Sequence, residues 1–135
     1  MLRIFIGIFM LLHGLVHLWY FVMSRGLVEF KPEMGWSGKS WLLTNLLGNS
    51  TTNVLASLLY LLATIGFVIG SIGIFGQQEW WRPFVVGSAI FSSLTILLFW
   101  DGRMQMLVEK GLLGFVINLI ILFALLVLKW PAATF

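Results

Sequence analysis

An apolar run near the amino terminus limits most strongly what this chain can fold into. It covers residues 2–24, LRIFIGIFMLLHGLVHLWYFVMS, and no Asp, Glu, Lys or Arg lies between Arg3 and Arg25. An α-helix needs about 20 such residues to cross the core of a bilayer. The run nevertheless carries His13 and His17 at its middle. The sequence therefore predicts a membrane-spanning helix with polar groups at mid-depth.

The polar residues of this run share one helical face. They follow one another at spacings of seven, three, four, three and four residues: Arg3, Met10, His13, His17, Tyr20 and Ser24. These spacings are those of a single helix face. Lipid cannot satisfy polar groups, so we expect this face to point toward other helices.

Composition excludes a soluble domain and several kinds of site. Of the 135 residues, 60% are hydrophobic and only 10% are charged, against about 25% charged residues in soluble domains. The net charge of +3 comes from Lys and Arg beside the apolar runs, which does not indicate nucleic-acid binding. The absence of cysteine excludes disulfides, iron–sulfur clusters and Cys-type zinc sites. We expect a multi-pass integral membrane protein, in contact with the lipid bilayer.

Three further apolar runs follow the first. We predict membrane spans at about 2–24, 54–75, 83–100 and 111–129, within a single domain over residues 1–135. Tryptophans stand near the ends of these runs, as in the aromatic belts of membrane proteins: Trp19, Trp80, Trp81, Trp100 and Trp130. The predicted fold is all-α, a four-helix transmembrane bundle with both termini on the same side.

A short helix is also predicted in the first connection, within residues 40–50, SWLLTNLLGNS. Ser40 is placed to cap it, its leucines share one face, and Gly48 is placed to end it. Two interpretations are open. The segment lies in the membrane interface as an amphipathic helix, or it packs as a loop on the helix ends.

Small residues line one face of the second span. Gly66, Gly70 and Gly73 lie on this face, and glycines at such spacings let another helix backbone come close. We predict that another helix packs there. That helix belongs to this chain, to a membrane protein partner or to a second copy of this chain.

Polar residues gather at the predicted mid-depth of the bundle. In an antiparallel arrangement the span centres fall near His13, Thr64, Ser92 and Ile120. The candidate ligand-binding residues are His13, His17, Tyr60 and Asn118 at this level, and Tyr20 toward the side of the first loop. Two interpretations are open here as well: the serines and Asn118 satisfy the two imidazoles by hydrogen bonds, or a ligand does.

A metal site is not expected at this pair of histidines. Imidazoles four residues apart can share one ion, but a third ligand is needed and no acidic residue lies within any span. Met10 would suit Cu(I), and haem would need a ligand from a second subunit. Copper and haem are therefore disfavoured. No catalytic triad or phosphate-binding loop can be identified in the sequence. The sequence therefore leaves open whether the protein is an enzyme.

The first span carries an arginine near its start, a glycine one turn later, and a His-Gly pair followed by a second basic residue. These are Arg3, Gly7, His13-Gly14 and His17. In this pattern and in its four spans the chain resembles the DoxX-like family of small membrane proteins. The resemblance implies a link to membrane redox chemistry, since the family includes a subunit of a thiosulfate:quinone oxidoreductase. The family's Gly-Pro-Gly-type ending is absent, because the last span closes on residues 129–131.

On this resemblance we expect a quinone-like or other hydrophobic ligand between the helices near His13 and His17. The two imidazoles would donate hydrogen bonds to a ligand carbonyl or relay protons to it, with Tyr60 and Asn118 as neighbours. The ligand is expected to enter from the side that bears Tyr20 and Asp101. Two other functions stay open: a structural or accessory subunit of a larger membrane complex, and a small transporter.

Overall fold

The computed structural model describes residues 1–26, 39–102, 104 and 111–132, and this part of the chain is all-α. Its helices are α1 (Leu2–Ser24), α2 (Leu43–Phe75), α3 (Trp81–Leu98) and α4 (Leu113–Leu122), and α4 continues into the π-helix η3 (Phe123–Val127). The prediction of an all-α fold with four helices is therefore confirmed. The first helix has the predicted bounds, and the third is displaced by only two residues.

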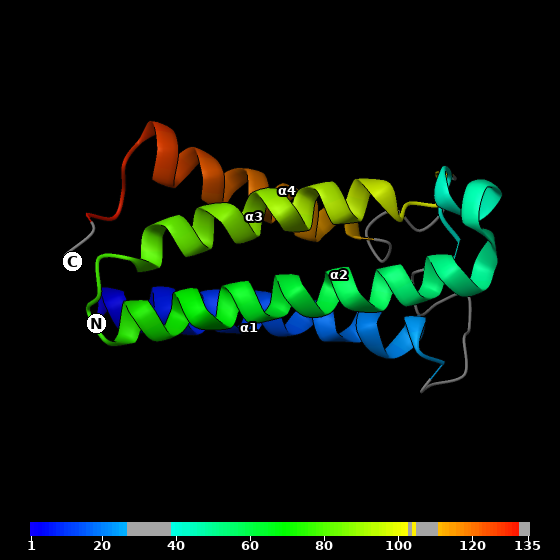
Figure 1. Ribbon diagram of the computed structural model, residues 1–135. Coiled ribbons are helices and arrows are strands. Elements are labelled where there is room, and N and C mark those ends of the chain that lie inside the picture. Colours follow the sequence, from blue (N-terminus) through cyan, green and yellow to red (C-terminus); the bar gives the residue numbers. More distant parts are fainter. Residues whose placement is uncertain (27–38, 103, 105–110, 133–135) are drawn as a thin grey trace.

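The helices form two antiparallel pairs (Figure 1). α2 packs on α1 and on α3, and α4 packs on α3. The short connection between α2 and α3, residues 76–80, places these two helices side by side in opposite directions. As predicted for the two termini, α1 begins and η3 ends at the same end of the bundle.

The distribution of polar side chains is the reverse of that in a soluble protein. Large apolar side chains face outward on every helix, for example Leu12 on α1, Leu62 on α2, Leu94 on α3 and Ile120 on α4. Buried positions hold hydroxyl, amide and imidazole groups: His13, His17, Ser57, Thr64, Ser71, Ser92, Ser93, Thr95 and Asn118. Among the described helices, α1, α2 and α3 are long and apolar enough to cross a membrane.

The fourth helix is shorter than the predicted span at 111–129. It has ten α-helical residues followed by five π-helical ones, a length of about 22 Å if all rose as in an α-helix. Gly111 and Leu112 continue this helix backward as π-helix with φ of 116° at Gly111, and Lys129 beyond its end has a left-handed φ of 52°. An α-helix cannot continue through such residues. This is the physical reason for the difference.

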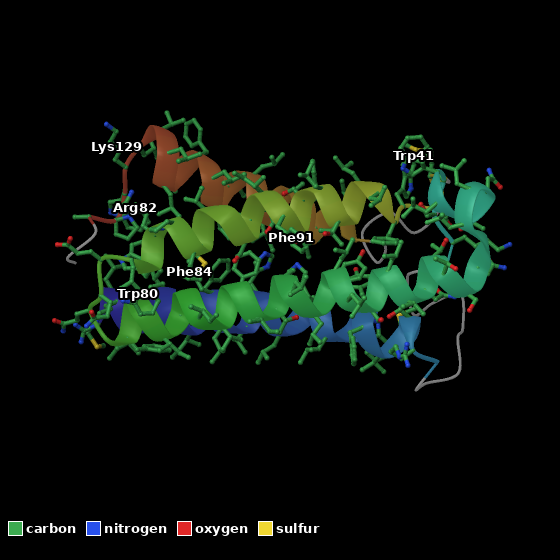
Figure 2. The ribbon with its side chains drawn as sticks, in the orientation of Figure 1. Trp41, Trp80, Arg82, Phe84, Phe91 and Lys129 are labelled. Carbon is green, nitrogen blue, oxygen red and sulfur yellow. The ribbon has the colours of Figure 1, made fainter. Side chains whose placement is uncertain are left out.

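Arg82 at the start of α3 holds the end of this fourth helix in place. Its guanidinium donates to the carbonyl of Leu125 at 3.0 Å and to the carbonyl of Pro131. The last carbonyls of a helix have no hydrogen-bond partner within it, and the end of the helix carries a partial negative charge. A guanidinium there supplies both the hydrogen-bond donors and the opposite charge. Figure 2 shows Arg82 and Lys129 at this end of the bundle, far from Trp41.

The element α2 contains both the predicted short helix at 40–50 and the predicted span at 54–75, as two helices joined across a kink at Gly48. α2 begins at Leu43 and passes through Gly48, whose φ of 82° and ψ of 167° are not helical. Glycine adopts this conformation without steric cost. The short helix therefore ends at Gly48, as predicted, and lies beside the end of α3, while the long helix after the kink runs along α1 (Figure 1).

Ser40 caps the first turn of the short helix, as predicted. Its Oγ accepts hydrogen bonds from the amides of Leu42 at 3.3 Å and Leu43 at 3.1 Å. Its own amide donates to Oγ1 of Thr44 at 2.8 Å. The two residues thus satisfy amide groups that the start of a helix leaves free.

The same segment also closes the end of α3. Ser40 Oγ donates to the carbonyl of Leu98 at 2.5 Å, and Trp41 Nε1 donates to the carbonyl of Leu97 at 2.8 Å. The amide of Trp41 donates to the carbonyl of Trp100 at 2.7 Å. These bonds favour the interpretation in which the segment packs on the helix ends.

The glycine face of α2 packs directly on α3, which confirms the predicted helix contact. A Cβ on Gly66 would lie 2.1 Å from Oγ of Ser88, and one on Gly70 would lie 2.6 Å from Cγ2 of Val85. Gly73 faces Trp81, whose side chain is buried rather than part of an outer belt. Because α3 covers this face, an outside partner would need another surface.

Two glycines of α1 likewise allow α2 to pack closely against it. A Cβ on Gly7 would lie 2.5 Å from the ring of Phe75, and one on Gly14 would lie 2.6 Å from Cβ of Phe67. The two glycines are one heptad apart, on the face that carries the histidines. Close packing here brings both imidazoles against α2.

Replacing Gly70 by leucine should lower the free energy of unfolding by about 1–3 kcal/mol, because the new side chain overlaps Val85. Gly87 on α3 gives a matched control, since a Cβ there meets no atom within 4 Å. Gly87→Leu should keep or raise stability, because leucine favours a helix more than glycine does. Thermal unfolding in detergent compares the two. Equal losses in both variants would contradict the packing assigned to Gly70.

Candidate functional site

The two histidines of α1 lie inside the bundle, as the spacing predicts. His13 is 6% exposed and His17 is 3% exposed. The ring of Phe67 on α2 contacts both, at 4.9 Å from the centroid of His13 and 5.6 Å from that of His17. The imidazoles are therefore pressed between an aromatic wall on α2 and the polar side chains of α3 and α4.

A continuous set of hydrogen bonds joins these imidazoles to Asn118 and Ser92. Nε2 of His13 lies 2.7 Å from Oδ1 of Asn118, and Nδ2 of Asn118 donates to Oγ of Ser92 at 2.9 Å. Ser92 Oγ lies 2.5 Å from Nε2 of His17. Nδ1 of His17 lies 3.0 Å from the carbonyl of His13 and 3.2 Å from that of Gly14. We call this set the polar network; it ties α1, α3 and α4 together.

The polar network has one direction when both imidazoles are neutral. Nδ1 of His17 faces two carbonyls, so it must carry the proton, and Nε2 of His17 is left as an acceptor. Ser92 therefore donates its hydroxyl proton to His17 and accepts from Asn118. The amide oxygen of Asn118 then accepts from Nε2–H of His13. The two histidines consequently hold opposite tautomers.

One nitrogen of this site has no partner in the part of the chain that the structure describes. It is Nδ1 of His13, a bare acceptor in the tautomer just assigned. Among side-chain nitrogens and oxygens without a partner in that part, only Nε of Arg3 is fully enclosed. The ring of Phe9 lies over the imidazole, with centroids 6.2 Å apart and planes within 3°.

The two predicted tyrosines form a second group beside the polar network. The rings of Tyr20 and Tyr60 stack at 4.9 Å, and the ring of Tyr60 lies 6.3 Å from that of His17. Tyr60 is only 1% exposed and also contacts Phe99. The structure thus brings all five predicted residues together, His13, His17 and Asn118 by hydrogen bonds and the tyrosines by ring contacts.

Two further residues take part in the site: Ser92, which was expected in this polar layer although not as a ligand-binding residue, and Phe67, which was not predicted. Ser92 connects Asn118 to His17, and Phe67 backs both imidazoles. The position of Ser92 at the centre of the third span had indicated that its hydroxyl lies at the level of the histidines. Phe67 gave no such signal, because an aromatic residue in an apolar run is ordinary.

An apolar cavity of about 280 Å³ adjoins the polar network, between α1 and the end of the fourth helix. Its inner lining includes Ile6, Phe9, Met10, Ile121, Ala124 and Leu125. Met10 precedes His13 by about one helical turn, and Ile121 follows Asn118 by the same distance. Neither His13 nor Asn118 lines the cavity, which lies about one helical turn from their hydrogen bond, toward the beginning of α1.

Comparison of the chain with protein-family models, curated proteins and solved structures gives no match. The resemblance to the DoxX-like family therefore stays a hypothesis that rests on the residues of α1.

The opposite tautomers can be read by nitrogen NMR on protein labelled only in its two histidines. Protonated and bare imidazole nitrogens resonate in separate ranges, so His13 should show a protonated Nε2 and His17 a protonated Nδ1. The variant His17→Phe assigns the signals. The same tautomer in both rings would contradict the direction of the polar network.

Asn118→Leu should lower the free energy of unfolding by about 1–3 kcal/mol, because it leaves the Nε2–H of His13 buried without an acceptor. Adding His13→Phe removes that orphaned group, so the double variant should lose less than the sum of the two single losses. A control pair combines Asn118→Leu with Ser71→Ala, whose hydroxyl bonds within its own helix. Additive losses in the first pair would show that the two side chains are not coupled.

Proposed function

We propose that this chain is a multi-pass integral membrane protein that binds a quinone-like apolar ligand between α1 and the fourth helix. The observation that carries the proposal is the cavity lined by apolar side chains beside the polar network. Ligand sites typically combine an apolar enclosure with a few convergent polar groups. Here Phe9 and Met10 would hold the apolar part, and the polar network lies about one helical turn beyond them.

Location in a membrane is supported by the outer surface of the described helices. Their outward side chains are predominantly Leu, Ile, Phe and Val, while hydroxyl and imidazole groups are buried. Such a surface would drive aggregation in water. In lipid it is the expected arrangement, since polar groups there must be satisfied within the protein.

The position of the cavity changes the expected route of the ligand. The predicted entrance was the side of Tyr20 and Asp101, whereas the cavity lies toward the beginning of α1. Phe5 and Phe9 line it and are 65% and 47% exposed. A ligand would therefore enter sideways from the acyl chains. A volume of about 280 Å³ suits a single substituted ring with part of its tail.

A second function is supported by the same opening between α1 and the fourth helix. An apolar helix of a larger complex would also cover Phe5 and Phe9, which makes the chain an accessory subunit. The glycine face of α2 does not serve this purpose, because α3 already covers it. The two functions differ in what accompanies the purified protein: a small molecule or a polypeptide.

The test is native mass spectrometry of protein purified in mild detergent. We expect a stoichiometric apolar small molecule on the native chain and on Leu94→Trp, which alters only an exposed side chain of α3. Ala124→Trp should fill the cavity and lose the molecule while the protein stays folded. A native chain that carries no such molecule would contradict ligand binding, and a stoichiometric polypeptide would establish the accessory subunit.

A further inference from the structure

We propose that the end of the bundle where α1 and α3 begin binds an anionic phospholipid. Its phosphate lies at Arg82 and Lys129, and one acyl chain covers the opening between α1 and the fourth helix. This inference rests on the membrane location proposed above. It goes beyond the proposed function, because the lipid lies over the opening of the cavity and not in its interior.

Three cationic side chains lie at this end of the bundle. Arg3 is in the first turn of α1, Arg82 is in the first turn of α3, and Lys129 follows η3. The segments that meet there are residues 1–3, 76–82 and 128–132 (Figure 1), and Glu79 is their only acidic residue. Two helices begin and two end at this level, so the helix dipoles largely cancel. The positive charge of this end therefore comes from its side chains.

Arg82 brings this charge to the end of the cavity. Its guanidinium donates to the carbonyls of Leu125 and Pro131, and both of these residues line the cavity. A guanidinium has five N–H donors, so two carbonyls leave donors free for a phosphate oxygen. Lys129 is exposed and lies two residues before Pro131. Figure 2 shows Arg82 and Lys129 at the same end of the bundle.

Exposed tryptophans place these cations at the level of lipid headgroups. Trp80 directly precedes α3 and is 41% exposed, and Trp130 directly follows Lys129 and is 52% exposed. Indole rings in such positions are typical of the boundary between hydrocarbon and headgroups. Lipid phosphates are found at this boundary, next to where Arg82 and Lys129 lie.

The surface on the hydrocarbon side of these cations suits an acyl chain. Phe5 and Phe9 stand at the opening of the cavity and are largely exposed, and the residues behind them are apolar. Cationic groups at the headgroup level with an apolar groove below them match the two parts of an anionic phospholipid. A free phosphate would use only the cations, and a neutral lipid only the groove.

The experiment is native mass spectrometry of the full chain in mild detergent, with equal amounts of palmitoyl-oleoyl phosphatidylglycerol and palmitoyl-oleoyl phosphatidylcholine. The two lipids have the same chains and differ in net charge. Each cation beside an anionic headgroup corresponds to about a fivefold change in affinity. We therefore expect the native chain to retain phosphatidylglycerol in large excess, on the order of 25-fold for two cations.

Lys129→Gln should lower this preference about fivefold, and its exposed position makes it a safe variant for folding. Lys39→Gln is the matched control, because it removes an exposed lysine close in sequence to Trp41, at the opposite end of the bundle. It should keep the native preference. Excess inorganic phosphate should not displace phosphatidylglycerol.

The position of the acyl chain is read with phosphatidylglycerol that carries a diazirine in one chain. After irradiation, peptide mapping should find the label at the start of α1 or the end of the fourth helix. The exposed side chains of α3, such as Leu94, should be labelled no more than by the phosphatidylcholine analogue.

Four results would overturn this inference: equal retention of the two lipids, equal losses in Lys129→Gln and Lys39→Gln, displacement by phosphate, or preferential labelling of the outer face of α3. Equal losses would mean that net charge alone attracts the lipid, and displacement would mean that the site takes a free anion. A small molecule inside the cavity is scored in the same spectra by its own mass. The proposed function and this inference therefore fail separately.

Discussion

The structure depends on one constraint: polar groups inside a bundle with an apolar exterior must satisfy each other. The hydrogen bonds that join His13, Asn118, Ser92 and His17 meet this constraint with side chains from α1, α3 and α4. These three helices can form the bonds only at one register, because a shift of one residue along any helix turns its polar group away. In an apolar environment the orphaned groups would be costly. The polar network therefore selects the register as well as stabilising it.

Close packing through α2 makes this polar network geometrically feasible. Glycines of α1 and α2 remove the side chains that would hold the helices apart, against Phe67 on one side and Val85 on the other. α2 itself contributes only an aromatic wall to the imidazoles. It acts as a spacer that sets how far α1 lies from α3. The hydrogen bonds between helices form only because the glycines let the helices come close. This explains why small residues and polar residues occur together in the same spans.

Much of this was predictable because helix periodicity and polarity are local properties of the sequence. The bounds of α1, the inward face of the histidines and the contact of Gly70 with another helix all follow from spacing. The break at Gly48 was predictable too, whereas the packing of the short helix against the end of α3 was not, because it depends on tertiary bonds of Ser40 and Trp41. The pairing of Ser92 with Asn118 likewise depends on how α3 and α4 face each other.

The residues that carry the family resemblance now have individual physical roles. Gly7 and Gly14 let α2 approach, and His17 and Nε2 of His13 complete the polar network. Any bundle with this architecture would need such residues, so the pattern by itself argues for a fold and not for an activity.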